Sequence, residues 1–197
     1  MTSSTAVSKT AVTAEPILPL LADRWSPRSY DKSYVLTQAE LTSILEAGRW
    51  APSANNAQPT RYFVVTREDA NHAAIAGTLA GWNQAWAPDA SAIILVGVAA
   101  ANADGVVNPW AQYDAGQSVA HLSVQAHHLG LHVHQMAGLD VAKAAEILGV
   151  PADIQLIVSA VVGKVAPAEN LPEPLHEREI APRSRKALGE VVLYGRP

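Results

Sequence analysis

The segment that most constrains the fold is a short, uninterrupted apolar run near the middle of the chain. Residues 92–99 read AIILVGVA, in which Ile93, Ile94, Leu95 and Val96 are adjacent. A strand with one face in water would alternate apolar and polar residues, whereas a strand without alternation is buried on both faces. The surrounding run is also shorter than the ~18 residues that a membrane-spanning helix needs. We therefore expect residues 92–99 to form an internal strand of a sheet.

The rest of the chain alternates between helical and extended patterns. Thr37 and Glu40 form a capping box, which predicts a helix over residues 38–50. The other predicted helices cover 68–80, 115–129 and 140–148; the other extended segments cover 61–66, 131–136, 154–162 and 190–194; residues 167–182 are predicted to be irregular. Without a regular βαβ order or an internal repeat, the predicted class is α+β, or irregular α/β, in one domain.

Composition excludes several classes of function. The 197 residues carry a formal net charge of -4, so no basic excess is available for nucleic-acid binding. Cysteine is absent, which excludes disulfides and thiolate chemistry and fits a reducing cytoplasm. Residues 1–15 are rich in Ser, Thr and Ala without the apolar core of a signal peptide, so we expect a flexible arm before one domain over 16–197.

A histidine cluster raises the question of a metal site. The chain contains His121, His127, His128, His132 and His134 within a short stretch, without a nearby acidic ligand before Asp140. Gly130 separates the helical members from the extended ones, which breaks the spacing of a ligand set. We expect surface or hydrogen-bonded histidines and no metal. Neither a P-loop nor a G-x-G-x-x-G sequence is present.

Two basic clusters lie at opposite ends of the sequence. The first is RWSPRSY from Arg24 to Tyr30, and the second is RSRK from Arg183 to Lys186. Each combines guanidinium groups with a hydroxyl, which is chemistry that binds a phosphate. Either cluster alone is better explained as a solvated basic turn.

A third stretch, APSANNAQPTRYFVV over residues 51–65, joins an uncharged polar loop to a strand. Together with the two basic clusters, this loop resembles the nitroreductase family of FMN-dependent oxidoreductases. Two further stretches share the likeness, WNQAWAPDAS over residues 82–91 and GLHVHQMAGLD over 130–140. The resemblance runs from Arg24 to the end of the chain, through five stretches in the family's order.

The resemblance implies a role for each matching residue. Arg24, Trp25 and Ser26 would hold the phosphate and ribityl end of FMN, and Arg183 and Arg185 would bind the phosphate. Arg28 would reach the pyrimidine edge of the ring, and Asn83 would hydrogen-bond the ring. The backbone of Met136, Ala137 and Gly138 would face N5; some relatives have a Glu at the position of Ala137. The loop residues Pro52, Ser53, Ala54, Asn56 and Gln58 would serve the flavin of the opposite subunit, with Asn55 only turning the chain.

The same resemblance implies an architecture and a reaction. The expected fold has three layers, with a mainly antiparallel sheet between helices, in a homodimer that exchanges the C-terminal strand. The expected reaction is ping-pong hydride transfer from NADH or NADPH to a nitroaromatic, a quinone or a similar acceptor, without a catalytic side chain. Trp82, Trp86, Trp110 and Tyr113 are candidate pocket walls or ordinary core or interface aromatics. A dehalogenase, flavin-fragmenting or oxidase reaction on the same fold, or non-catalytic FMN binding, remain alternatives.

One helical pattern has two interpretations. Ala115, Val119, Leu122, Ala126 and Leu129 form a seam with a 4-3-4-3 spacing. This seam either packs inside one subunit or packs against its twin across a two-fold axis.

Overall fold

The computed structural model describes residues 8–101 and 104–195. Its centre is an antiparallel sheet with the strand order β1-β2-β4-β3. The strands are β1 (Thr60–Thr66), β2 (Ala92–Ala99), β3 (His132–Met136) and β4 (Ile154–Gly163). The four internal strands predicted from the sequence are thus confirmed, each with bounds within one residue of the prediction.

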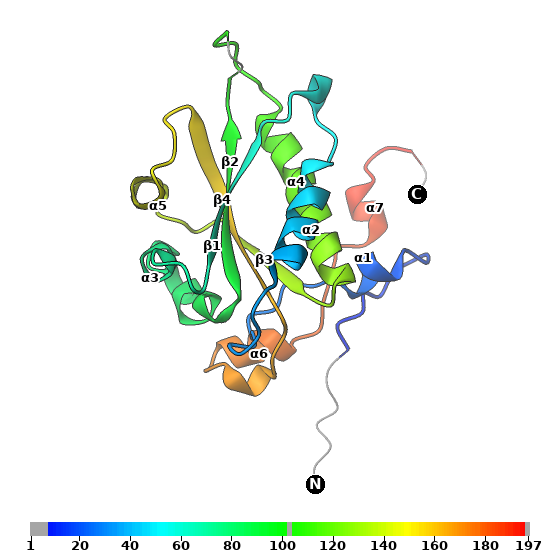
Figure 1. The fold of residues 1–197 in the computed structure, drawn as a ribbon. Coiled ribbons are helices and arrows are strands. Elements are labelled where there is room, and N and C mark those ends of the chain that lie inside the picture. Colours follow the sequence, from blue (N-terminus) through cyan, green and yellow to red (C-terminus); the bar gives the residue numbers. More distant parts are fainter. Residues whose placement is uncertain (1–7, 102–103, 196–197) are drawn as a thin grey trace.

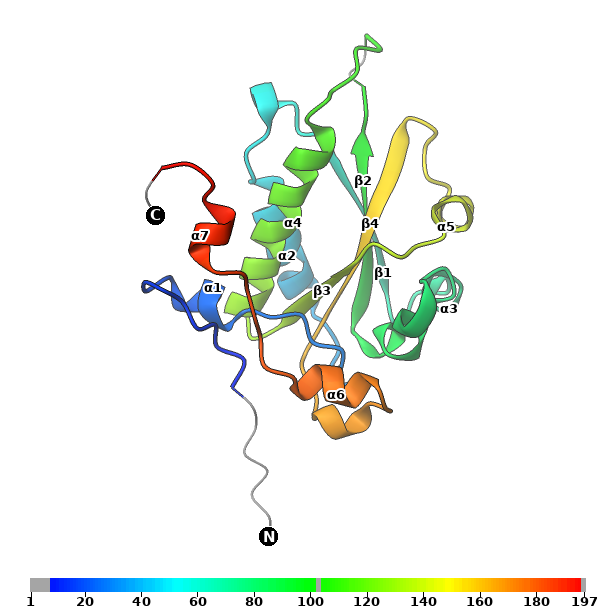
Figure 2. The same cartoon turned by 180° about the vertical axis from the view of Figure 1, so that it is seen from behind.

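Helices cover both faces of this sheet (Figures 1 and 2). The helices α2 (Gln38–Arg49) and α4 (Ala111–His128) pack on one face, and α3 (His72–Ala76) and α5 (Val141–Leu148) cover the other. Successive β2 residues enter the two cores in turn: Ile93 lies in the α3–α5 core and Ile94 in the α2–α4 core. Burial of β2 on both faces and the three-layer α+β architecture are therefore confirmed.

The seam of α4 lies within its own subunit. Val119, Leu122 and Ala126 are at most 1% exposed and belong to the same core as Ile94 of β2. Of the two interpretations, the packing inside one subunit is the correct one. The opposite side of α4 is free to face solvent or a partner.

The predicted helix over residues 68–80 is wrong in extent. Only α3 is helical there, and a short 3₁₀ helix, η2 (Gly81–Ala85), follows it. The backbone oxygen of Thr78 accepts from the N–H of Asp140 at 2.8 Å, and Leu79 bridges Leu139. Pairing with residues far along the chain pulls this segment out of the helix that its alanines favour locally.

The C-terminal region differs from its predicted structure in two places. The run predicted as irregular contains η4 (Ala168–Asn170) and α6 (Leu175–Ile180). The strand predicted over residues 190–194 is not formed in this single chain: α7 (Leu188–Val191) ends within that segment, and residues 192–194 are neither helix nor strand. The Glu190 carboxylate accepts from the N–H of Ala187 at 2.9 Å, which closes a helical turn in a segment that has no strand beside it in this single chain.

The described start of the chain is attached to the domain. The Lys9 ammonium donates to the backbone oxygen of Ala181 at 2.6 Å, and the N–H of Ala11 donates to the oxygen of Ala22 at 2.9 Å, beside α1 (Pro19–Asp23). Residues 1–7 of the predicted arm lie outside the described residues. Among the helices of the described ranges, none is both long enough and apolar enough to cross a bilayer.

Candidate functional site

The two basic clusters meet in one pocket. A cavity of about 280 Å³ lies between the segment that follows α1 and the segment that follows α6. Its lining contains five arginines and one lysine. The residues are Lys9, Arg24, Trp25, Ser26, Arg28, Arg178, Ala181, Pro182, Arg183 and Arg185. All the residues predicted to bind the phosphate therefore line the same cavity, although about 155 positions separate the two clusters in the sequence.

Positive charges crowd one another in this basic pocket. The pKa of Arg24 is lowered by burial and then by the charge of Arg185. The pKa of Arg183 is lowered by burial and then by Arg24 and Arg185. An anion within the pocket would relieve this repulsion and accept charge-assisted hydrogen bonds from several guanidinium groups. The arrangement has the charge and the donors that bind a phosphate.

The walls of the basic pocket are joined by contacts between the two ends of the chain. An Nη atom of Arg183 donates to the backbone oxygens of Lys9 and Ala22 at 2.6 and 2.5 Å. The Lys9 ammonium lies 4.9 Å from the ring centroid of Trp25, within range of a cation–π interaction. Lys9 and Arg178 were not predicted as site residues, because Lys9 falls in the expected arm and Arg178 in a charged run expected to be irregular. No local signal in the sequence marks either residue.

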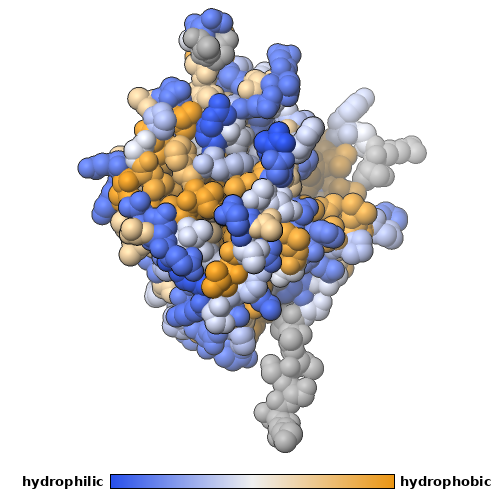
Figure 3. Space-filling view, viewed as in Figure 1, coloured by the Kyte–Doolittle hydropathy of each residue, from blue (hydrophilic) through white to orange (hydrophobic). Residues whose placement is uncertain are grey.

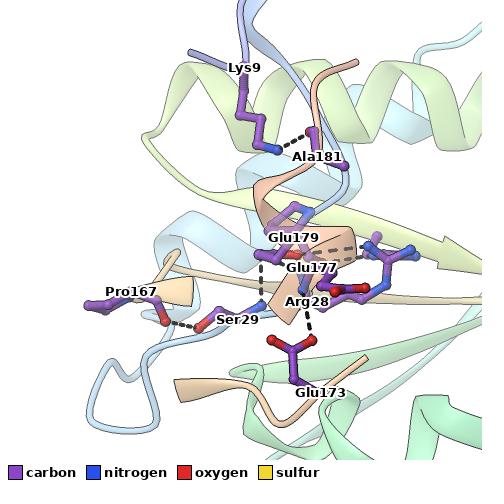
Figure 4. A network of polar contacts seen from close by, with 10 residues as sticks. Lys9, Arg28, Ser29, Pro167, Glu173, Glu177, Glu179 and Ala181 are labelled. Atoms are coloured by element: carbon purple, nitrogen blue, oxygen red, sulfur yellow. Dashed lines mark hydrogen bonds and ion pairs between the residues drawn. The ribbon is translucent and has the colours of Figure 1, made fainter. Parts of the chain in front are cut away.

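Arg28 lies beside a buried acid (Figure 4). The carboxylate of Glu179, which is 3% exposed, accepts from the backbone N–H of Arg28 at 2.9 Å and of Ser29 at 3.0 Å. An Nη atom of Arg28 lies 3.8 Å from the same carboxylate. Glu179 was also missed, because an acid in the charged stretch that holds Glu177 and Arg178 reads as an exposed side chain.

Strand β3 leads away from the basic pocket. The ring of Trp25 meets His132 edge-on, with centroids 6.1 Å apart, and Nδ1 of His134 lies 2.8 Å from the oxygen of Pro27. Burial is the largest cause that lowers the pKa of both histidines to about 4, so both rings are neutral near pH 7. At about 3.3 Å per residue, Met136 lies roughly 13 Å beyond His132 along the strand. Residues 136–138 thus lie at a fixed distance from the basic pocket.

The predicted ring-binding residues Asn83 and Gly138 are brought together around Ala80. The N–H of Ala80 donates to the oxygen of Gly138 at 3.0 Å, and the N–H of Asn83 donates to the oxygen of Ala80 at 3.3 Å. A Cβ on Gly138 would lie 2.8 Å from the Cβ of Ala80, so the approach depends on glycine. Ala137, between Met136 and Gly138, is exposed.

The aromatic residues proposed as pocket walls separate into two groups. Trp86 is 1% exposed and packs between Tyr30 and His134, with centroids 6.2 and 4.6 Å away. This burial is that of a core residue and does not support a wall role in an open pocket. Trp110, just before α4, and Tyr113, in its first turn, are 58% and 67% exposed. Trp82 is also exposed, in η2.

The polar loop over residues 53–58 lies at the other end of α4 from the basic pocket (Figures 1 and 2). It includes η1 (Ala54–Asn56), and the N–H of Ala54 donates to the carboxylate of Asp114 in the first turn of α4 at 3.2 Å. Because an 18-residue helix is about 27 Å long, this loop is remote from the pocket of its own chain.

The polar loop has an unusual backbone. Asn55, Asn56 and Gln58 all have positive φ, at 51°, 56° and 48°. Asparagine tolerates this left-handed region, whereas glutamine adopts it at a cost of about 1 kcal/mol or more. The hydroxyl of Ser53 accepts from the N–H of Gln58 at 3.0 Å and thereby holds the turn. The side chains of Asn55, Asn56 and Gln58 are exposed. Because Asn55 and Asn56 both have positive φ, both of them turn the chain.

The histidines do not converge on a common metal position. Within residues 8–101 and 104–195, no group of three or more His, Cys, Asp or Glu side chains could hold a metal ion. The rings of His127 and His132 contact each other edge-on, with centroids 4.8 Å apart.

The comparisons with known proteins agree with this geometry. The model of the nitroreductase family matches residues 21–164. An uncharacterised 15.4 kDa protein of Mycolicibacterium smegmatis is 35% identical over 128 residues, which are 65% of this chain and 85% of that protein. An oxygen-insensitive NADPH nitroreductase of Helicobacter acinonychis is 34% identical over 77 residues, 39% of this chain and 36% of that enzyme. This chain therefore matches little more than a third of the length of that enzyme.

A solved structure extends the similarity over nearly the whole chain. The crystal structure of an oxidoreductase containing FMN superposes with a TM-score of 0.89 and 33% identity, over 96% of this chain and 96% of that one. The family model matches well over half of the chain, and the fold is shared; together these observations establish the family of the protein. The chain belongs to the nitroreductase family.

Proposed function

We propose that this protein is an FMN-dependent oxidoreductase that uses NADH or NADPH to reduce small electron-poor acceptors. The observation that carries the proposal is the basic pocket, in which Arg24, Arg183 and Arg185 surround a cavity beside β3. The resemblance to an oxidoreductase containing FMN supports it over most of the chain.

The residues present fit the cofactor. A phosphate requires about two positive charges and several donors, which Arg24, Arg183, Arg185 and Ser26 supply. Backbone groups at residues 136–138 lie at the other end of β3, so phosphate and ring would be held at separate ends of one wall. When bound, FMN supplies the redox chemistry by accepting a hydride equivalent from the nicotinamide and passing it to the acceptor. The protein contributes binding, orientation and electrostatics.

The acceptor would stack on an exposed face of the cofactor. Trp110 and Tyr113 are exposed aromatic side chains that could contact a flat, apolar molecule such as a nitroaromatic or a quinone. Arg28 would stabilise negative charge at the pyrimidine edge of the ring when the flavin is reduced. Such a reaction requires no nucleophile or general base from the chain.

We further propose a homodimer in which the polar loop of each chain completes the site of its partner. The loop is too far from the pocket of its own chain to contribute to it, yet it presents exposed amides on a constrained backbone. The C-terminal tail is unusually apolar for a surface segment: Val191 is 64%, Leu193 90% and Tyr194 98% exposed. Figure 3 shows further apolar side chains at the surface near α1 and α7. A second copy would cover these residues, and the tail could then pair with a partner strand.

Anaerobic mixing tests the proposed activity. The protein loaded with FMN is mixed with NADH and, separately, with NADPH, and the flavin absorbance is followed. Bleaching by either nucleotide, followed by return of the colour when a quinone or nitroaromatic is added, is the expected result. If the flavin binds but neither nucleotide bleaches it, the reductase proposal is wrong.

A further inference from the structure

Glu179 is a buried acid beside the basic pocket, whose charged lining residues are all cations. It lies in α6, four residues before Arg183, and is 3% exposed. Its carboxylate accepts the N–H groups of Arg28 and Ser29 and lies 3.8 Å from an Nη atom of Arg28 (Figure 4). The hydroxyl of Ser29 donates in turn to the oxygen of Pro167 at 2.6 Å. The position of Arg28 is therefore fixed through both its backbone and its guanidinium group.

The backbone contacts alone do not require a negative charge. A neutral amide oxygen could accept the same N–H groups, whereas a carboxylate also places a full charge in a buried position. Two cations face this charge: Arg28 at 3.8 Å, and Lys9, whose pKa Glu179 raises against the larger effect of burial. Tyr30 stays neutral, because burial, and then Glu179, raise the pKa of its hydroxyl. The negative charge of Glu179 therefore offsets part of the positive charge of the basic pocket.

We propose that Glu179 is a positioning residue that fixes Arg28 and lowers the reduction potential of the bound FMN. The inference rests on the proposed function, because it requires FMN in the basic pocket. Reduction adds negative charge at the pyrimidine edge of the ring, and a cation there favours the reduced form. Glu179 offsets part of the charge of Arg28 and so disfavours the reduced form. A lower potential makes the reduced enzyme a stronger donor to its acceptor.

The charge can be removed with little change in shape. Glu179→Gln keeps an oxygen that can accept the N–H groups of Arg28 and Ser29 but removes the negative charge. Glu177→Gln is the matched control, because it removes the same charge from the same helix at an exposed position. Both variants are loaded with FMN, and their midpoint potentials are measured by anaerobic dye equilibration.

The expected result is a more positive potential for Glu179→Gln alone. Removal of one charge at this range changes the preference for reduced over oxidised FMN by about tenfold, a shift of about +30 mV for a two-electron couple. Glu177→Gln should stay at the wild-type value, because its charge is exposed and screened.

Three outcomes would overturn the proposal. A Glu179→Gln potential equal to or below that of the wild type contradicts it, even if the melting temperature falls, since that would be a purely structural role. If the glutamine variant does not fold, Glu179→Asp draws the carboxylate back from Arg28 and should give a smaller shift of the same sign; an unshifted potential there rejects the idea. Wild-type protein that does not bind FMN would overturn the proposed function and this inference together, whereas an FMN-bound but unshifted variant overturns only the role of Glu179.

Discussion

The basic pocket and the polar loop differ in how much of a site one chain can build. The pocket is assembled within a single chain, since Arg24 and Arg183 line one cavity and Arg183 is bonded to the N-terminal segment. The loop over residues 53–58 is held by hydrogen bonds from Gln58 to Ser53 and from Ala54 to Asp114, but it lies at the far end of α4. One region presents positive charge, and the other presents uncharged amides.

This difference separates two tasks in the proposed site. Charge is long-ranged and tolerant of position, so a cluster of guanidinium groups can capture an anion without an exact fit. Amide hydrogen bonds require a defined direction, and the constrained backbone at Asn55, Asn56 and Gln58 supplies it. We infer that the pocket determines whether FMN binds and that the loop determines how the ring is oriented.

The largest effect should follow from removing the C-terminal charges of the pocket. Arg183→Ala combined with Arg185→Ala should weaken FMN binding about 100-fold or more, because two charge-assisted interactions of about 1.5–3 kcal/mol each are lost. Fluorescence titration with FMN measures the affinity. Lys186→Ala is the control, since it removes an adjacent exposed charge that is not in the lining of the pocket. A double variant that keeps stoichiometric FMN would place the phosphate elsewhere.

Subunit mixing should show the next largest effect, and it tests the comparison itself. One protein carries Arg183→Ala and Arg185→Ala, and the other carries Asn56→Ala and Gln58→Ala. If each site takes its pocket from one chain and its loop from the other, random exchange makes about half of the dimers mixed, each with one intact site, so about a quarter of all sites are restored.

The readout is nicotinamide oxidation by the mixture relative to each variant alone. The two variants are unfolded and refolded together, because subunits of the proposed interwoven dimer would exchange slowly. Activity of the mixture that equals the mean of the separate variants would mean that the pocket and the loop of the same chain act together. Each variant unfolded and refolded alone is the control for refolding yield.

Much of the fold could be predicted because its signals are local. The continuous apolar run of β2 and the capping box of α2 determine their elements within short segments of sequence. The strand predicted over residues 190–194 failed because a strand needs a neighbour, and a single chain offers none at that place. The helix predicted over residues 68–80 failed because Thr78 pairs with Asp140, at a separation that periodicity does not detect.

The candidate site follows the same division. Arg24 and Arg183 could be predicted because each lies in a short pattern that carries its own chemistry. Glu179 could not, since its role depends on contact with Arg28, 151 residues away. Lys9 was missed for the same reason, and Trp86 was proposed as a wall although its neighbours Tyr30 and His134 place it in the core.

Acidification should lower the free energy of unfolding through a buried histidine near the basic pocket. Burial is the largest cause that lowers the pKa of His134 to about 4, so its ring is neutral in the folded protein. As the pH falls, the unfolded chain takes up the proton before the folded protein does. The contribution of His134 to the free energy of unfolding is therefore fully present above about pH 6.5 and is lost between about pH 6.5 and 4. The expected loss at pH 5 is about 1–2 kcal/mol from this residue.

Urea unfolding at pH 7.5 and pH 5 measures this loss. His134→Gln removes the titrating group but keeps a donor for the oxygen of Pro27, so its stability should change less between the two pH values. His128→Gln, at an exposed position of α4, should behave as the wild type does. Equal pH dependence in all three proteins would contradict the assignment to His134.

The smallest effect concerns whether the N-terminal segment belongs to the pocket. Lys9 lies over Trp25 and donates to Ala181, so its ammonium contributes charge to the lining as well as packing. Lys9→Ala should weaken FMN binding about five- to tenfold, because a partly exposed charge contributes about 1 kcal/mol. Lys9→Arg should bind within about twofold of the wild type, since it keeps the cation over the same ring.

The salt dependence separates charge from packing at this position. If Lys9 acts through its charge, the difference between Lys9→Ala and the wild type should shrink as the salt concentration rises from 0.05 to about 0.5 M, where screening becomes strong. A difference that does not depend on salt would assign Lys9 a packing role only. The positive charge of the pocket would then come from the two arginine clusters alone. The contrast with the uncharged loop would rest on these clusters, which the sequence alone identifies.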